Sequence, residues 1–214
     1  PIKNSSGDDI IKVDFGSTLP KGIGLDVYNM NLQCEATWDM ICSGRTKGVF
    51  QLESPLGRQW AKKLEPRNIQ ELGALGALIR PGCLRAMSGN PPKSMTQRYC
   101  DRKHGVEEIS YPHESLKPIL KNTQGVLTFQ EQAMKIAVVL AGFDAQQADI
   151  LRKAIGKKNA AVMHDLKQSF LDGAKNTGVI GEALAEEVFG WIQESQRYSF
   201  NKSHADAYAL NGYW

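Results

Sequence analysis

The sequence lacks the short motifs that mark the common catalytic and metal centres. Its 214 residues contain only four cysteines and four histidines, and no two cysteines form a CxxC pair. Structural zinc sites draw on closely spaced cysteines and histidines, so the sequence argues against one and favours a reduced, intracellular chain. There is also no Walker loop, no GxGxxG and no nucleophile elbow. Hydrolase chemistry therefore has no support in the sequence.

Long apolar runs and a large excess of one charge are missing as well. No stretch approaches the roughly 18 apolar residues of a membrane span, and no secretory signal peptide is present, so we expect no membrane partner. The 26 Lys and Arg residues exceed the 23 Asp and Glu residues by only three. This balance permits an anionic partner without requiring one. A case for nucleic-acid binding must therefore rest on where the basic residues lie.

Helical periodicity dominates what is present, and it predicts a mainly α protein. One strand-like alternation precedes the helices at residues 9–15, and a loop rich in glycine follows to residue 34. The main body is predicted to be a single all-helical unit with a loop at 83–95. The expected helices cover residues 38–42, 56–64, 69–79, 96–103, 115–120, 130–141, 144–156, 159–175 and 182–195, and a last helix begins near residue 205.

A short helix with basic residues around its end is the first candidate site. Asp144 occupies the N-cap position and Gln147 follows three residues later, as in a capping box. Arg152 falls on the apolar face of this helix, which is formed by Ala145, Ala148, Leu151 and Ile155. Gly156 is expected to end the helix, with Lys153, Lys157 and Lys158 close to that end. Such a helix could be directed at phosphate, and a solvated basic helix end is the open alternative.

The turn around residues 198–209 is the second candidate. Ser203 followed by Asp206 resembles the start of a capped helix, whose first backbone N–H groups are free donors. The neighbouring residues Asn201, Lys202 and His204 would make this helix start an anion site. Alternatively, Ser203 only caps the helix and His204 only packs.

Weaker candidates lie elsewhere in the chain. In the strand-like run 9–15, alternation places Lys12 and Asp14 on one face, either as functional groups or as an exposed ion pair on an edge strand. The basic residues Arg80, Arg102 and Lys103 stand in or next to predicted loops, where they could equally be ordinary surface.

Six blocks of residues resemble, in order, the catalytic alpha subunits of bacterial C-family replicative DNA polymerases. They are GVFQLES (48–54), LIRPG (78–82), DRKHG with EEISYPH (101–113), GVLTFQEQAMKIA (125–137), ADILRKAIGKK (148–158) and FNKSHADAYAL (200–210). The resemblance covers roughly residues 9–214.

This resemblance implies a domain organisation and a role for each candidate. Residues 1–16 correspond to the end of the palm domain, and 17–214 to a helical fingers domain that is incomplete at its C-terminus. Asp14 corresponds to the third metal-binding aspartate of the palm, with Lys12 near the triphosphate. The residues expected to meet the incoming nucleotide are Arg152, Lys153, Lys157, Lys158, Asn201, Lys202, Ser203 and His204, and those expected to meet DNA are Arg80, Arg102 and Lys103.

The implied reaction is nucleotidyl transfer from a deoxynucleotide to a primer 3′ end, with two Mg²⁺ ions. The implied partners are primer-template DNA, a dNTP, the rest of the palm and thumb, a sliding clamp and other replisome subunits, in the cytoplasm of a bacterial or phage-infected cell. The other two palm aspartates of the family lie upstream and are absent here, so we expect the 214 residues alone to be inactive.

Four departures from the family pattern indicate a divergent or phage-like member, or a fragment of one. They are the break after the strand at 16–20, Cys83 in place of a proline, Lys153 in place of a second arginine, and Asp206 in place of a small residue. Two other functions stay open: a non-catalytic relic that binds nucleic acid, and a helical scaffold that binds only protein.

Overall fold

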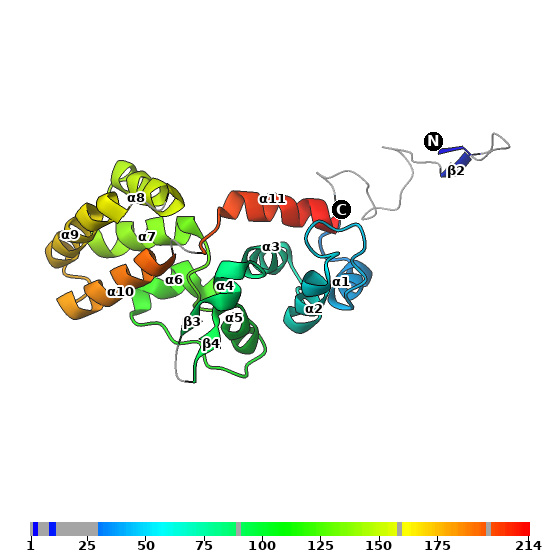
Figure 1. The fold of residues 1–214 in the computed structure, drawn as a ribbon, viewed down its shortest axis with the longest axis horizontal. Coiled ribbons are helices and arrows are strands. Elements are labelled where there is room, and N and C mark those ends of the chain that lie inside the picture. Colours follow the sequence, from blue (N-terminus) through cyan, green and yellow to red (C-terminus); the bar gives the residue numbers. More distant parts are fainter. Residues whose placement is uncertain (1, 4–8, 12–29, 89–90, 158–159, 196–197) are drawn as a thin grey trace.

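The computed structural model describes residues 2–3, 9–11, 30–88, 91–157, 160–195 and 198–214. Most of these residues are helical (Figure 1), as the sequence predicted. Two antiparallel strands near the N-terminus, β1 (Ile2–Lys3) and β2 (Asp9–Ile11), confirm the start of the predicted strand run, whose remainder lies outside the described residues. No helix in the described part is both long and apolar enough to cross a membrane.

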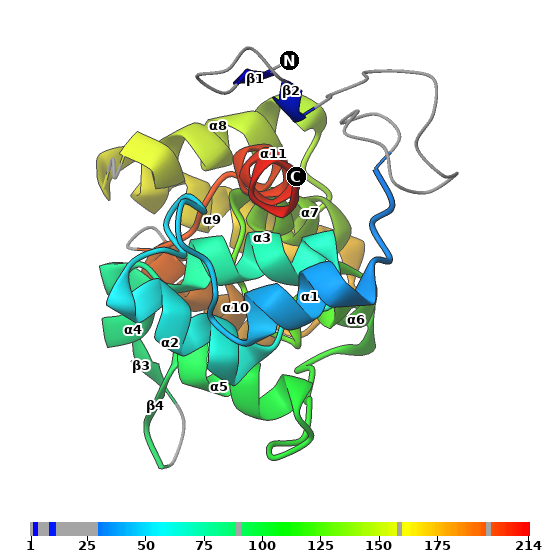
Figure 2. The same ribbon diagram turned by 90° about the vertical axis from the view of Figure 1, so that its right-hand side faces the viewer.

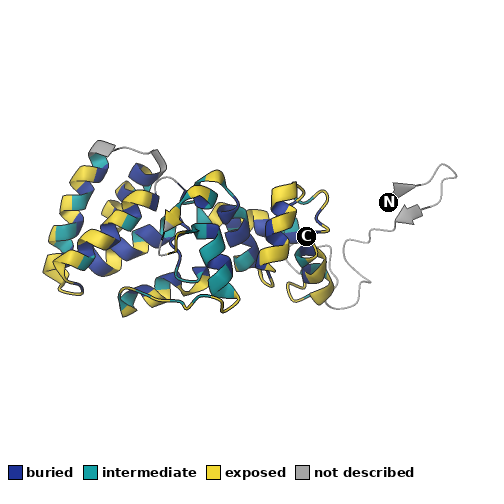
Figure 3. Ribbon diagram, turned by 60° about the horizontal axis from the view of Figure 1, so that its bottom comes forward, coloured by how far each residue is buried: buried dark blue, intermediate teal, exposed yellow. Residues whose placement is uncertain are grey.

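Apolar side chains gather in two separate clusters rather than in one. The first core joins α1 (Glu35–Cys42), α2 (Pro55–Leu64), α3 (Ile69–Leu78), α4 (Pro81–Arg85), α5 (Met95–Lys103) and α11 (Lys202–Tyr213). The second joins α6 (Lys117–Leu120), α7 (Gln130–Ala141), α8 (Ala145–Lys157), α9 (Ala160–Thr177) and α10 (Glu182–Ser195). Figure 3 shows the buried residues along both groups of helices.

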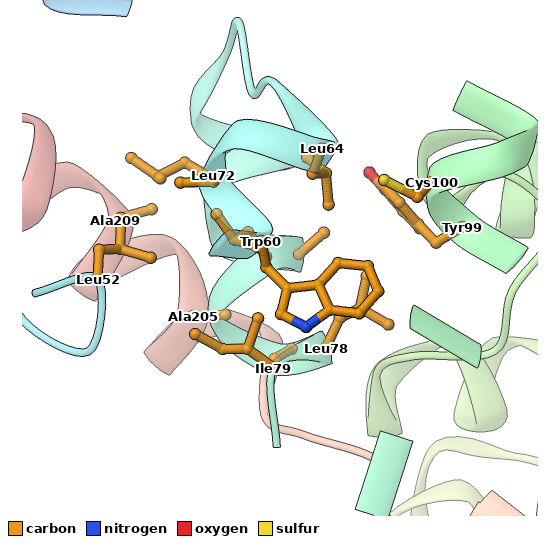
Figure 4. Packing of buried hydrophobic residues seen from close by; sticks show 14 of the residues in the cluster. Leu52, Trp60, Leu64, Leu72, Leu78, Ile79, Tyr99, Cys100, Ala205 and Ala209 are labelled. Carbon is orange, nitrogen blue, oxygen red and sulfur yellow. The ribbon is translucent and has the colours of Figure 1, made fainter. Parts of the chain in front are cut away.

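Helix α3 is the centre of the first core because it is apolar on nearly all sides. Trp60 and Leu64 of α2 and Tyr99 of α5 pack in the same cluster (Figure 4). On the side of α3 toward α11, a Cβ added at Gly73 would lie 3.3 Å from the backbone oxygen of Ala205. The glycine therefore lets the two helices approach closely.

Helix α11 returns from the second group of helices to lie along α3 (Figures 1 and 2). Its far end is held by Tyr213, whose ring packs 4.7 Å from that of Trp38. The hydroxyl of Tyr213 donates to the backbone oxygen of Asn31 at 2.7 Å and accepts from the N–H of Cys34 at 3.2 Å. The C-terminal helix thus closes the first core.

The predicted helices at 130–141 and 182–195 have the observed bounds of α7 and α10. One other segment differs from expectation. The predicted loop at 83–95 contains the end of α4, which starts at Pro81, and the short hairpin β3 (Met87–Ser88) and β4 (Lys93–Ser94). A proline suits the first helical position because its missing N–H would be unpaired there. Between α5 and α7, the 3₁₀ turn η1 (Glu114–Leu116) and α6 together cover the helix predicted at 115–120, and a second 3₁₀ turn, η2 (Lys121–Thr123), follows.

Gly173→Ala is expected to destabilise the protein by about 1–3 kcal/mol. A Cβ at Gly173 in α9 would overlap the backbone oxygen of Ala141 at the end of α7, so the two helices would have to separate. Thermal unfolding measures the effect. The matched control is Gly190→Ala in the interior of α10, where an added Cβ meets nothing within 4 Å. It should stabilise by about 0.5–1 kcal/mol through helix propensity alone. Equal stabilisation by both changes would contradict the predicted clash.

Candidate functional site

Helix α8 begins as the sequence predicted. The backbone N–H of Asp144 donates to Gln147 Oε1 at 3.0 Å, and the N–H of Gln147 donates to Asp144 Oδ1 at 2.7 Å. The two side chains therefore form a reciprocal capping box. The helix continues to Lys157, one residue beyond the predicted end at Gly156. Of the predicted apolar face, Ala145 is exposed, whereas Ala148, Leu151 and Ile155 are buried.

Arg152 meets an acidic side chain of its own helix. Its Nε and Nη2 atoms donate to Asp149 Oδ1 at 2.9 and 2.8 Å. Lys153 reaches the other carboxylate oxygen of Asp149 at 2.8 Å. Hydrogen bonds from Lys153 and then Arg152 lower the pKa of Asp149 below its ordinary value. The Arg152 side chain remains 34% exposed, so it can be reached from solvent.

The start of α11 differs from the predicted one. The helix begins at Lys202, and its N-cap is Asn201, whose side-chain oxygen accepts from the His204 N–H at 2.8 Å. Ser203 therefore lies inside the first turn and is not the cap. Glu131, from the first turn of α7, accepts the N–H of Lys202 at 2.9 Å. The helix start predicted to bind an anion thus already holds a carboxylate of the protein.

Lys202 has a partner one turn along α11. Its Nζ lies 2.6 Å from Asp206 Oδ2. Both side chains are partly exposed, at 42% and 32%. Asp206 is therefore the counter-ion of Lys202 at the start of α11.

A row of aromatic rings, here called the ring file, lies along one side of α11 and consists of Phe200, His204, Tyr208 and Phe50. The His204 ring lies 5.2 Å from Phe200, edge to face, and 4.3 Å from Tyr208. Tyr208 in turn lies 4.6 Å from Phe50, which is 53% exposed. The sequence did not indicate this ring file: the spacing of four places His204 and Tyr208 on one face of α11, but Phe200 precedes the helix, which begins at Lys202. Phe50 joins them only through the tertiary fold.

Arg80 extends the ring file at its other end. The Cζ atom of its guanidinium lies 3.7 Å from the centre of the Phe200 ring, a cation–π contact. Its buried Nε has no hydrogen-bond partner among the described residues, and neither has the buried Oγ of Ser199. The fold therefore brings together two segments predicted separately, the LIRPG block and the FNKSH block.

Arg102 and Lys103 lie in a different place and have internal partners. Arg102 Nε contacts Glu107 Oε1 at 2.9 Å and its Nη1 donates to the Gln124 oxygen at 3.0 Å. Lys103 pairs with Glu71 at 3.0 Å. Their side chains are only 8% and 12% exposed. These contacts hold the segment after α5 in place. A role of Arg102 and Lys103 in DNA binding stays a prediction.

Hydrogen bonds near the ends of α5 lower the pKa values of two carboxyl groups. Burial of Glu107 favours its neutral form, but hydrogen bonds from Arg102 and Lys93 outweigh this and lower its pKa. Burial acts likewise on Asp101, and hydrogen bonds from Lys93 and Gln97 lower the pKa of that carboxyl. Both groups are therefore ionised at neutral pH.

A second surface, not indicated by the sequence, is a groove between the two groups of helices. It has a volume of about 620 Å³ and is lined by Met95, Arg98, Tyr111, Glu187, Trp191 and Tyr198, among others. Burial raises the pKa of the Tyr198 hydroxyl above its ordinary value. Among the predicted site residues that the structure describes, only Arg102 lines this groove.

Several predicted site residues cannot be placed. Lys12, Asp14 and Lys158 lie outside the described residues, and for Lys157 only the helical backbone is described. Within the described ranges no group of three or more His, Cys, Asp and Glu residues could hold a metal ion. The described part thus does not itself provide the Mg²⁺ site that the resemblance implies.

Comparison with known proteins gives consistent matches. A family model described as the bacterial DNA polymerase III alpha subunit finger domain matches residues 11–178. DNA polymerase III subunit alpha of Escherichia coli K12 is 42% identical over 194 residues, which cover 88% of this chain and 16% of that protein. The subunits of Aquifex aeolicus and Staphylococcus epidermidis ATCC 12228 are 39% and 38% identical, over 90% and 89% of this chain and 16% and 17% of their own lengths.

These matches place the helical body in the class of polymerase finger domains. The chain belongs to the family of bacterial DNA polymerase III alpha subunits. It spans 16–17% of the length of these relatives, so the activity of a whole alpha subunit is for this chain a proposal.

Proposed function

We propose that this chain is the fingers part of a DNA-directed DNA polymerase, together with the end of its palm. It takes part in template-directed addition of deoxynucleotides to a primer 3′ end. The observation that carries the proposal is the ring file of Phe200, His204, Tyr208 and Phe50, with the Arg80 guanidinium on its first ring. Partly exposed rings beside a basic group suit the stacking of bases and the neutralising of phosphates.

The basic residues of α8 and of the α11 start would bind the triphosphate of the incoming nucleotide. Arg152 and Lys202 are each partly exposed and each paired with a carboxylate one turn away. Exposed pairs of this kind contribute only about 0–1 kcal/mol, so a phosphate can replace the carboxylate at small cost. Phosphoryl transfer depends largely on such charge and positioning.

Template and primer would lie against the side of Arg80, in a complex that includes the remaining palm and thumb. Two Mg²⁺ ions supply Lewis-acid stabilisation of the attacking and leaving oxygens in this class of reaction. Asp14 would contribute one of their carboxylate ligands, with Lys12 near the triphosphate, and the others come from outside this chain. A sliding clamp and other replisome subunits are the further proposed partners.

The ring file is tested by DNA titration of the 214-residue chain at two salt concentrations. Single-stranded DNA should bind, and its affinity should fall with salt because phosphate contacts release counter-ions. Tyr208→Ala should weaken binding by about 1–3 kcal/mol, the usual contribution of one stacked base. Tyr111→Ala, at the groove between the two groups of helices, is the aromatic control and should change little.

The DNA titration also tests the alternative function of a protein-interaction scaffold, and primer extension tests that of a non-catalytic relic. No binding of DNA at low salt would favour the protein-interaction scaffold. Binding that is insensitive to Tyr208→Ala would refute the ring file as the contact surface. The relic is distinguished by primer extension, because a polymerase that contains these residues should extend a primer and a relic should not.

A further inference from the structure

Glu131 makes the side-chain contacts that join the starts of two helices from different cores. It stands in the first turn of α7, in the second core, and reaches the start of α11, in the first. Its Oε2 accepts the backbone N–H of Lys202 at 2.9 Å, and its Oε1 accepts from Asn201 Nδ2 at 2.8 Å. The side-chain oxygen of Asn201 accepts from the N–H of His204 at 2.8 Å.

Backbone hydrogen bonds run beside this contact. The N–H of Gln130 donates to the Phe200 oxygen at 3.0 Å, and the N–H of Phe200 donates to the Thr128 oxygen at 3.1 Å. Together they form a parallel bridge between Phe129 and Phe200. The strand-like entry to α7 and the entry to α11 therefore lie side by side. By accepting the N–H of Lys202, Glu131 continues this pairing into the first turn of α11.

We propose that Glu131 is a positioning residue for the nucleotide site. A carboxylate at a helix start is favoured by the helix dipole and by the free N–H groups there. By holding Lys202 N–H and the Asn201 amide, Glu131 sets the direction of the first turn of α11. That turn carries the Lys202 and His204 side chains, so their orientation depends on Glu131. The nucleotide part of this inference rests on the proposed function.

Asn201 has a different role under this proposal from the one predicted. Its amide is engaged at both ends inside the protein, with Glu131 at the nitrogen and the His204 N–H at the oxygen. It acts as the connector between the carboxylate and the helix, not as a ligand of the triphosphate.

Swapping the carboxylate and the amide between positions 131 and 201 tests this arrangement in the 214-residue chain. Glu131→Gln replaces one accepting oxygen by an amide nitrogen, which then faces a hydrogen-bond donor. Asn201→Asp replaces the donating amide nitrogen by a carboxylate oxygen, which then faces the Glu131 carboxylate. Each single change should accelerate amide exchange at Lys202 and His204 about 10- to 100-fold, because a donor or acceptor loses its partner.

The double variant is expected to restore the hydrogen bonds, with the direction of the bond between the two side chains reversed. The amide introduced at position 131 donates its N–H to the carboxylate introduced at position 201, and its oxygen accepts the N–H of Lys202. The other oxygen of the new carboxylate accepts the N–H of His204. Amide exchange should therefore return to within about threefold of the wild type.

Binding of dATP, followed by NMR titration of the same variants, separates positioning from mere stability. Affinity should fall about tenfold in each single variant and recover in the double variant. Glu182→Gln, an exposed first-turn acid of α10, is the control and should alter neither measurement. Protected amides in the single variants would overturn the proposal. So would recovery of protection without recovery of affinity, since Asn201 would then be a ligand itself. If the wild type does not bind dATP at all, the proposed function fails, while the exchange data still decide whether Glu131 holds α11.

Discussion

Lys202→Ala and Arg152→Ala are each expected to raise the KM for the incoming nucleotide, or to lower kcat, by roughly 10- to 100-fold in a polymerase that contains these residues. The loss of one charge-assisted hydrogen bond to a phosphate costs about 1.5–3 kcal/mol, which is the size of that change. Both side chains are partly exposed and stand beside acids that do not bury them. Steady-state primer extension with varied dNTP concentration measures the effect.

The carboxylates paired with Arg152 and Lys202 provide a further test. Asp206→Asn removes the competitor of a phosphate at Lys202, and Asp149→Asn does so at Arg152. Because each exposed pair is worth at most about 1 kcal/mol, we expect these changes to lower the KM by no more than about fivefold. A rise in KM would mean instead that the acids orient the basic side chains for the nucleotide.

Lys175→Ala is the control for the basic substitutions. Lys175 is exposed in the last turn of α9, where a lysine is also favoured by the helix dipole. The double variant of Arg152 and Lys202 should lose less than the sum of the single losses, since both would contact one triphosphate. Equal small effects from all three lysine and arginine changes would show a diffuse basic surface with no defined pocket.

Asp14→Asn in a polymerase that contains this chain is expected to lower primer extension by about a thousandfold or more. The substitution keeps the size of the side chain and removes the charge that a metal ligand of the palm requires. The loss of a ligand to a catalytic metal removes several kcal/mol of transition-state stabilisation, and about 4 kcal/mol corresponds to that factor. DNA affinity should remain nearly unchanged, because backbone phosphates are held by other residues.

The matched control is Asp9→Asn, at the start of β2. Strand alternation places residue 9 on the face opposite residue 14, so this change should leave extension within about threefold of the wild type if the strand continues. Near-normal turnover of the Asp14→Asn variant would show that the glycine and proline break at 16–20 has displaced the metal site.

Local signals predicted most helices because they act within one turn. Asp144 and Gln147 cap each other across three residues, and their hydrogen bonds form as expected. The bounds of α7 and α10 follow from apolar spacing that ends at Gly142 and at the polar turn after Ser195. Helix α4 was not predicted, because a proline directly after a helix, here Pro81, is usually a signal that the helix has ended. At the first position of a helix a proline is instead a good starting residue.

The start of α11 could not be located from local pattern. Both Asn201 and Ser203 are good cap residues, and nothing within the block distinguishes them. Asn201 is the cap in the fold because Glu131, 70 residues earlier, holds its amide nitrogen while Phe200 is paired with residues 128–130. The partner of Arg152 could not be determined from local pattern either: the sequence left a phosphate site and a solvated basic helix end open, and Asp149 is its partner among the described residues.

The amino-acid sequence by itself determined the helical class, the order of the blocks and the family to which they belong, since these depend on short-range spacing and on residue identity. Only the tertiary structure decided that the apolar residues divide into two cores and that Arg80 stacks on Phe200. It also decided that Phe50 joins the rings of α11, and that Glu131 occupies the start of that helix. These are contacts between segments far apart in the chain, and their pairing depends on which surfaces exclude water together when the helices pack.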